Sequence, residues 1–500
     1  MARYNDDNSH QGKFIPVSFD RQILPGSFEH TLSLLIDEHL DMSVFDDRYN
    51  NDENGRPAYQ PAILLRVILA AYARGFTSSR QISQLREENV VFMALAGDTQ
   101  PHFTTIARFV ADMKDVIQDL FTAVLMVCDS QGLIGREMFA IDGCKLPSNA
   151  SKAWSGTRAE MDKKHKKIDR AVHRMLARHR EEDEAGGVND HVRRAAEEAR
   201  VERLKEASAK IKKHLQTSDA RRGLSGKEVQ GNVTDNDSAK MKTSRGTIQG
   251  YNGVAAVDAR HQIVIAAEAF GQGPENNLIE PMLNLVAGKL DERYLSQARL
   301  TADSGFHSSA SIAHCAERQV DAYIADGNFR KRDPRFADQA RHQPPERRSK
   351  YFKASDFQYD AVSGTCHCPA GKTLWKRCER EIDGRAYIMF TGYLEVCRGC
   401  PLQTTCMRKP PTRTGRQVMI AKDAANSKNG IDCMKRKIDS DAGRHIYEQR
   451  LGVVEPVFGN INTNKRMDRF RHRGKAKVNA QWLMYCMVHN IEKLQRHGRL

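Results

Sequence analysis

The sequence lacks any apolar run that is long enough to cross a membrane. Its longest apolar stretch, residues 62–73 (AILLRVILAAYA), is interrupted by Arg66 and is much shorter than a spanning helix requires. The opening residues, MARYNDDNSH, also lack the basic-then-apolar pattern of a secretory signal. These absences predict a cytoplasmic protein with no membrane partner.

An excess of acidic residues is absent as well. The 500 residues include 78 Lys and Arg against 63 Asp and Glu, which gives a formal net charge of +15. A basic excess of this size favours a polyanionic partner such as nucleic acid, although basic enzymes without such a partner also exist. The chain is too long for one simple core, so we expect about two to four domains.

Apolar spacing predicts an all-α N-terminal domain over residues 1–132. Pro61 suits the first position of a helix, and Ser78 or Ser79 suits the N-cap of a second helix. A third helix is expected over residues 104–128. Short helices joined by tight turns fit a helix-turn-helix DNA binder and an ordinary helical bundle equally well. DNA binding by this domain is therefore a hypothesis.

The remainder of the chain predicts an α/β fold that is interrupted twice. Strand-like and helix-like segments alternate over residues 133–155 and 218–329, as in an α/β layer architecture. Residues 156–217 contain almost no aromatic residues and carry two apolar seams among Lys, Arg and Glu. This pattern predicts a charged helical hairpin, either a solvated coiled coil or an arm that follows DNA.

The C-terminal part of the chain begins with the second interruption. Residues 330–418 combine charge, proline and cysteine and predict a Cys-rich insertion. The final part, residues 419–500, is expected to contain a helix around residues 453–461, a basic stretch, and an amphipathic helix over residues 478–494.

Carboxylates at the ends of two predicted strands indicate a metal site. The runs FAID and LTAD end at Asp142 and Asp303, and each aspartate precedes a loop that contains glycine. Open α/β sheets carry their ligands at strand ends, so the two side chains could converge. A third carboxylate, Glu455, stands among apolar residues in VVEPVFGNI, where its charge requires either solvent or a metal. Three convergent carboxylates suit Mg²⁺ or Mn²⁺, and two such ions can promote phosphoryl transfer.

Several blocks of the chain resemble, in order, bacterial insertion-sequence transposases of the DDE type. YQPAILLRVILAAYARGF, SSRQI and HFTTIARF resemble their InsH-like helical N-terminal domain. FAIDGCKLPSNASK, KTSRGTIQGYNGVAAVD, ADSGFHS and VEPVFGNI resemble successive parts of their catalytic domain. The resemblance implies an RNase H-like catalytic domain in which Asp142, Asp303 and Glu455 are the catalytic residues and bind two divalent ions.

The resemblance also implies the reaction and the partners. The family cuts DNA at the terminal inverted repeats of its element and joins the freed 3′-hydroxyls to target DNA. Handling two ends implies at least a homodimer on DNA, at the nucleoid in the cytoplasm. Two alternative hypotheses for the function remain: a metal-dependent nuclease without strand transfer, and a DNA-binding protein whose catalytic site has decayed.

The positions around Glu455 match the family only in part. Related transposases carry Tyr-x-x-Arg ahead of the glutamate, and Tyr447 and Arg450 keep that spacing. Arg450 could hold a phosphate by bidentate hydrogen bonds, although the gap from it to Glu455 is one residue longer than expected. Asn462 stands where the family commonly has lysine, so that contact falls to Lys465 or is absent. Ordinary structural roles for Tyr447 and Arg450 remain open.

Six of the eleven cysteines lie in one short region, which suggests a metal rather than disulfides in a reducing compartment. Cys397, Cys400 and Cys406 follow the sequence CPAG, which begins at Cys368. Four thiolates suit structural Zn²⁺ or a [4Fe–4S] cluster. A metal could fold a segment whose sequence is otherwise poor in core residues, and reduced, inert thiols are the third alternative.

A basic stretch, residues 464–477 (NKRMDRFRHRGKAK), surrounds Phe470 directly after the predicted third ligand. It could clamp the phosphates beside the scissile bond, or it could be a solvated loop. Lys145 and His307 each lie near a predicted catalytic aspartate and could contact phosphate or be plain loop residues. The candidate DNA contacts are therefore Lys145, His307, Tyr447, Arg450, Lys465, Arg466, Arg469, Arg471 and Arg473.

Overall fold

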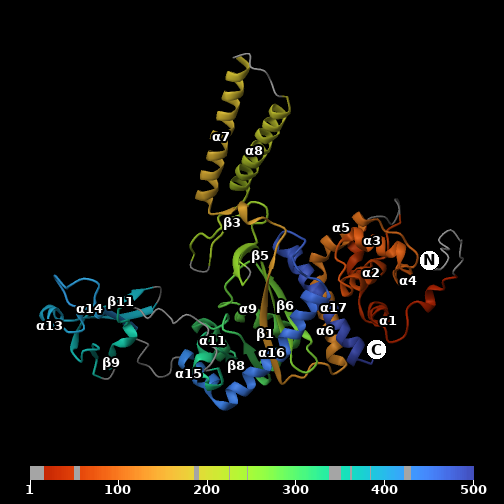
Figure 1. The fold of residues 1–500 in the computed structure, drawn as a ribbon. Helices are drawn as coiled ribbons and strands as arrows, with labels where there is room; N and C mark the ends of the chain where they lie inside the picture. The colour runs from red at the N-terminus through yellow and green to blue at the C-terminus, as the bar shows by residue number, and fades with distance from the viewer. Residues whose placement is uncertain are drawn as a thin grey trace, which may run out of the picture. The chain divides into compact units, whose positions relative to one another are not determined.

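The computed structural model describes the chain in two compact units (Figure 1). The first unit contains Met1–Phe306, His314–Ala322 and Glu448–Leu500, and the second contains His307–Ala313 and Tyr323–Tyr447. The described residues are 16–49, 57–184, 191–223, 226–244, 246–336, 351–360, 363–382, 385–421 and 430–499. Within these ranges, no helix combines the length and the apolar character that a membrane crossing requires.

The N-terminal part of the first unit is helical, as predicted. Pro61 is the first residue of α2, and Ser78 occupies the N-cap position of α3, although its hydroxyl does not bond to the helix. The helices are α1 (Phe28–Leu34), α2 (Pro61–Ala73), α3 (Ser79–Glu88), α4 (Val90–Leu95), α5 (Phe103–Asp112) and α6 (Ile117–Ser130), with shorter helical turns η2 (Leu35–His39) and η3 (Met42–Arg48).

The single helix expected over residues 104–128 is wrong. A 3₁₀ turn, η4 (Met113–Asp115), divides it into α5 and α6. No glycine or proline marks the break in the sequence, and Met113 is fully buried at the bend. The two halves pack on different partners, α5 on α3 and α6 on α17 (Lys475–His497), and this packing is the reason that the chain turns here.

A six-stranded mixed sheet forms the centre of the first unit. Its order is β4-β5-β1-β7-β8, and β6 also pairs with β5. The pairs β1–β5, β4–β5 and β5–β6 are antiparallel, whereas β1 and β7 are parallel. The strands are β1 (Met138–Pro147), β4 (Ala239–Thr243), β5 (Gly246–Asp258), β6 (Val264–Phe270), β7 (Arg299–Ala302) and β8 (Asp321–Ile324), and a small separate pair joins β2 (Ser155–Gly156) to β3 (Gly231–Asn232).

Helix α17 packs both on the sheet and on the N-terminal helices. It contacts β6 on one side and α6, α2 and α1 on the other. Trp482 donates from Nε1 to the carbonyl oxygen of Val254 at 3.0 Å, and the ring of Tyr485 stacks on that of Tyr72 at 5.1 Å. The prediction that this helix is amphipathic is wrong for its middle, because every residue from Gln481 to Ile491 is buried. The polar residues in this buried middle, Gln481, His489 and Asn490, are all hydrogen-bonded inside the protein.

Two further features of the first unit match the sequence patterns. Residues 158–184 and 191–217 form α7 (Arg158–Glu184) and α8 (His191–Thr217), which lie side by side (Figure 1). Val172, Val201 and Ile211 are buried in their seam. Helices α9 (Ile279–Leu290) and α10 (Glu292–Gln297) follow β6, and α9 packs on that strand.

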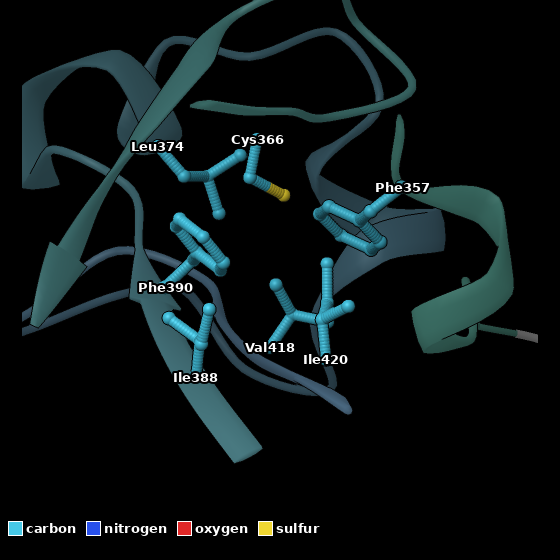
Figure 2. Close-up of a cluster of buried hydrophobic side chains, with 7 residues drawn as sticks. All are labelled: Phe357, Cys366, Leu374, Ile388, Phe390, Val418 and Ile420. Atoms are coloured by element: carbon cyan, nitrogen blue, oxygen red, sulfur yellow. The ribbon is translucent and has the colours of Figure 1, made fainter. Parts of the chain in front are cut away.

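The second unit has a core of its own, contrary to the expectation of a segment poor in core residues. A five-stranded antiparallel sheet has the order β13-β12-β11-β10-β9. Figure 2 shows the apolar cluster on this sheet, which consists of Phe357, Cys366, Leu374, Ile388, Phe390, Val418 and Ile420. Its strands and short helices are β9 (Gln358–Asp360), β10 (Thr365–His367), β11 (Thr373–Ile382), β12 (Arg385–Thr391), β13 (Gln417–Ala421), α13 (Leu394–Arg398) and α14 (Gln403–Cys406).

Four other helices complete the description. Helix α11 (Ser309–Glu317) follows β7, α12 (Phe329–Arg332) follows β8, and α15 (Gly430–Asp439) precedes α16 (Asp441–Gly459). Helix α16 carries Pro456 inside it and continues into the π-helical turn η9 (Asn460–Asn464).

Candidate active site

The parallel pairing of β1 and β7 places Asp142 and Asp303 beside each other. Ile141 pairs with Ala302 in the last position of the β1–β7 register, so each aspartate is the next residue on its own strand. The charge of Asp303 acts on Asp142. Strand β7 ends at Ala302, one residue before the predicted end at Asp303. The expectation that β1 ends at Asp142 is wrong, because its other edge stays paired with β5 as far as Pro147.

Asp142 is partly buried and has one cationic partner. Arg450 on α16 donates from Nη1 to Asp142 Oδ2 at 2.7 Å, and the amide of Gly143 donates to Oδ1 at 2.8 Å. Burial raises the pKa of the Asp142 carboxyl, Arg450 opposes that rise, and the negative charge of Asp303 adds to it. The Asp142 carboxylate therefore lacks full charge compensation, and a further cation at this place would be favourable.

A third aspartate at a strand end, Asp258, is built differently. Its carboxylate is fully buried and accepts hydrogen bonds from the amides of Gly135, Arg136 and Arg260 and from the hydroxyl of Tyr294. Because its oxygens are already occupied by these donors, Asp258 has a structural role. Position at a strand end alone does not identify a reactive aspartate.

Glu275 is a carboxylate near this site that the sequence analysis missed. It lies between β6 and α9, and its side chain is only 10% exposed. Asn252 donates from Nδ2 to Glu275 Oε1 at 2.8 Å, and Lys145 Nζ lies 3.3 Å from the same oxygen. Burial raises the pKa of Glu275, Lys145 opposes the rise, and Asp303 adds to it. The sequence GQGPENN resembles an ordinary loop, so no motif or periodicity could have singled out this residue.

Glu455 does not join these carboxylates in the structure. It is exposed on α16, whereas Val453, Val454 and Val457 around it are buried. Its carboxylate forms no ion pair with any described residue. In the sequence Glu455 stands among core residues, but on the helix its side chain faces solvent. Of the two expected environments for its charge, solvent or a metal, the structure therefore has solvent, which costs less free energy than burial of the charge.

Two predicted DNA contacts, His307 and Tyr447, lie in the second unit. His307 is partly buried, its Nε2 has no hydrogen-bond partner among the described residues, and burial lowers its pKa while Asp326 opposes the shift. Tyr447 is buried and packs edge-on against the ring of Phe329 at 5.0 Å. Packing of this kind is the structural role that the sequence left open for Tyr447.

The basic stretch is not a uniformly solvated loop. Lys465 has no exposed side-chain surface, and its Nζ lies 2.6 Å from Glu492 Oε1. Its ammonium is already paired inside the protein in this arrangement, which fits the alternative that the lysine contact is absent, and contact of Lys465 with DNA stays a prediction. Phe470 is also fully buried and packs edge-on against Tyr251.

The arginines of the same stretch differ in how they are held. Arg469 donates to the carbonyl oxygen of Ser148 at 3.1 Å, and Arg473 donates to that of Asn149 at 2.8 Å. These bonds attach the stretch to the residues that follow β1. Arg466 and Arg471 are exposed, and Arg471 also pairs with Asp468 at 3.0 Å. Arg473 is exposed as well, so all three of these arginines can meet a polyanion.

The cysteines predicted to bind a metal line one pocket of the second unit. Cys368, Cys397, Cys400 and Cys406 surround it together with apolar side chains such as Leu374. Burial raises the pKa of Cys406, and it raises that of the neighbouring core residue Cys366 to about 11. The apolar cluster already supplies the core that a metal was expected to supply. The structure gives no support to zinc or to a [4Fe–4S] cluster at these thiols.

No ready-made metal cage exists in the ranges of the chain that the structure describes. There, no group of three or more His, Cys, Asp or Glu side chains is arranged to hold a metal ion. Mg²⁺ does not require such a cage, because it is commonly held by one or two carboxylates together with waters and substrate phosphates. Asp142 and Asp303 follow paired positions of the β1–β7 register, and two carboxylates of this kind are a donor set that fits this cation.

Comparison with known families finds matches over two parts of the chain. A model described as a transposase DDE domain matches residues 367–495, and one described as a transposase domain (DUF772) matches residues 17–112. The chain thus matches two transposase domains, and its resemblance to insertion-sequence DDE transposases is confirmed. No curated protein matches the chain.

Proposed function

We propose that the protein is a transposase that cleaves the ends of its insertion sequence with divalent metal ions and joins them to target DNA. The observation that carries this proposal is the β1–β7 register, which sets Asp142 and Asp303 side by side at the end of their pairing. The matches to the two family models support the class of protein, a transposase. The pair of aspartates is the proposed site of the DNA cleavage and joining reactions.

Asp142 and Asp303 would hold the cation. When bound, Mg²⁺ or Mn²⁺ supplies Lewis acidity and activates the attacking water or 3′-hydroxyl. Arg450 opposes the rise that burial causes in the pKa of Asp142, and its hydrogen bond fixes the orientation of that carboxylate. Glu455 is proposed as the third acidic residue, because it lies on the same helix as Arg450 and its exposed carboxylate is free to meet a DNA-bound cation.

The fold and the partners are proposed on the same basis. A sheet that is antiparallel through β6, β5 and β1 and parallel from β1 to β7 supports an RNase H-like catalytic domain. The N-terminal helices, the α7–α8 hairpin and the exposed Arg466 and Arg471 are proposed DNA-contacting parts. Two ends must be processed, so a homodimer or larger assembly on DNA is proposed.

The test is an incubation of the purified chain with DNA that carries the terminal sequences of its own element. Cleavage is expected with Mg²⁺, and it is expected to disappear with EDTA and in Asp142→Asn and Asp303→Asn. Glu280→Gln is a matched control, because Glu280 is an exposed carboxylate in the first turn of α9. Cleavage that survives both aspartate substitutions would contradict the proposed site.

Joining requires its own measurement. Pre-cleaved ends incubated with a supercoiled plasmid should yield joined products that depend on the same aspartates. Metal-dependent cleavage without any joined product would identify a nuclease instead. Binding to the ends without cleavage by the wild-type chain would identify a decayed, DNA-binding protein.

A further inference from the structure

We propose that Glu275 is a fourth acidic residue of the active centre and that it binds a divalent cation together with Asp303. This inference rests on the proposed function, because it assigns one more residue to the same site. In the present arrangement the ammonium of Lys145, 3.3 Å from Glu275 Oε1, takes the place of that cation.

The first observation is the space beside Gly305. If Gly305 were replaced by a residue with a side chain, the new Cβ would collide with Glu275 Oε2 and would lie 3.1 Å from Asp303 Oδ1. Both carboxylates therefore face the same side of the glycine. The amide of Gly305 also donates to Asp303 Oδ1 at 2.9 Å. A side chain here would separate the two carboxylates, whereas glycine leaves them open to one shared ligand.

The second observation is Asn252, which is fully buried beside Glu275. Its Nδ2 donates to Glu275 Oε1, while its Oδ1 has no hydrogen-bond partner among the described residues. A Cβ on Gly143 would lie 2.8 Å from that oxygen, so the oxygen faces the backbone next to Asp142. An unpaired buried acceptor is costly, and a cation with its bound water would satisfy it.

The third observation is the arrangement of charges. Lys145 and Asn252 are opposite each other in the β1–β5 register, so their side chains share one face of the sheet, and both reach Glu275 Oε1. Asp303 acts electrostatically on both Asp142 and Glu275. The charge of Asp303 thus acts on both of the other carboxylates, and a divalent cation bound beside it would offset this repulsion.

The test measures binding of Mn²⁺ to the full-length chain without DNA, by electron paramagnetic resonance of the free ion. Glu275→Gln is expected to weaken binding of one ion by about 10- to 100-fold, the usual effect of losing a supporting ligand. Glu280→Gln should bind as the wild type does. Glutamine can still accept the hydrogen bond from Asn252, so the variant removes the charge while keeping the local packing.

A second variant gives a result that a purely structural role would not produce. If Lys145 occupies the cation position, Lys145→Met should strengthen Mn²⁺ binding, because it removes the competing ammonium. Unchanged binding in Glu275→Gln, weaker or unchanged binding in Lys145→Met, or no Mn²⁺ binding by the wild-type chain would each overturn the inference.

The cleavage assay separates this inference from the proposed function. Loss of cleavage in Asp303→Asn together with wild-type Mn²⁺ binding in Glu275→Gln would reject only the role of Glu275. Cleavage that persists in Asp142→Asn and Asp303→Asn would reject the proposed function itself.

Discussion

Arg450 donates from Nη1 to Asp142 Oδ2 at 2.7 Å, although the two residues are 308 positions apart in the chain. Both side chains are largely buried, with 10% and 23% of their surfaces exposed. The contact therefore joins helix α16 to the end of the β1–β7 pairing. It links the stability of this part of the first unit to the charge state of the proposed catalytic aspartate.

Removing Arg450 should affect both stability and cleavage. Arg450→Met leaves the Asp142 carboxylate without its partner, so we expect a loss of about 3 kcal/mol in the free energy of unfolding, measured by urea denaturation. The double variant Arg450→Met with Asp142→Asn should recover most of that stability, because no uncompensated charge remains. This double variant should still not cleave DNA. A double variant as unstable as the single one would show that the ion pair is not the cause.

Glu455 can be tested without disturbing the core. Its side chain is exposed, so Glu455→Gln should change the free energy of unfolding by less than about 0.5 kcal/mol. If it is the third acidic residue, the same change should reduce the cleavage rate by at least about 10³-fold, as expected when a charge is lost from a metal-dependent site. Normal cleavage by the variant would remove Glu455 from the proposed centre.

Substitution of Asp258 should lower stability without abolishing cleavage, whereas substitution of Asp303 should do the reverse. Asp258→Ala leaves the buried amide of Gly135 and the hydroxyl of Tyr294 without an acceptor, so we expect a loss of about 3 kcal/mol in unfolding free energy. Cleavage per folded molecule should persist at low temperature. Asp303→Asn should instead retain stability and lose cleavage, and the two variants can be compared in the same denaturation and cleavage assays.

The buried pair of Lys465 and Glu492 should matter for folding. Lys465→Ala leaves the Glu492 carboxylate unpaired, and a destabilisation of about 3–5 kcal/mol is expected. Lys477 is an exposed lysine nearby, so Lys477→Ala serves as a matched control with little effect on stability. If Lys465→Ala were as stable as the control but bound DNA less tightly, the assignment of Lys465 to the core would be wrong.

Buried His489 predicts a loss of stability in mild acid. Its Nε2 donates to the carbonyl oxygen of Gln262 at 2.9 Å, its Nδ1 accepts from Asn460, and burial lowers its pKa to about 3. The unfolded chain binds a proton near pH 6.5, so unfolding takes up a proton as the pH falls from 6.5 towards 3. This group alone should cost about 1.4 kcal/mol of stability per pH unit in that range.

The measurement for His489 is a series of urea denaturations between pH 7 and pH 4.5. His489→Gln removes the titrating group while it keeps a polar side chain at the same place, and its stability should fall less steeply with acid. Equal pH dependence in the wild type and the variant would mean that His489 does not contribute.

The elements that could be predicted from the sequence are those set by nearby residues. Pro61 and the apolar spacing after it define α2, and the apolar runs before Asp142 and Asp303 define strands, because these signals act within a few residues. The break at Met113 could not be predicted, since no turn residue marks it and packing on two different helices causes it. The core of the second unit was missed because its members come from separate short strands.

The sequence by itself determined the helical N-terminal part, the strands before Asp142 and Asp303, and the basic charge of the chain. Only the tertiary structure decided which charged groups meet. The β1–β7 register brings Asp142 to Asp303, and chain folding brings Glu275 to Lys145, turns Glu455 to solvent and buries Lys465 against Glu492. Strand ends alone suggested that Asp142 and Asp303 could converge, but the other pairings depend on contacts between distant parts of the chain that local sequence patterns do not specify.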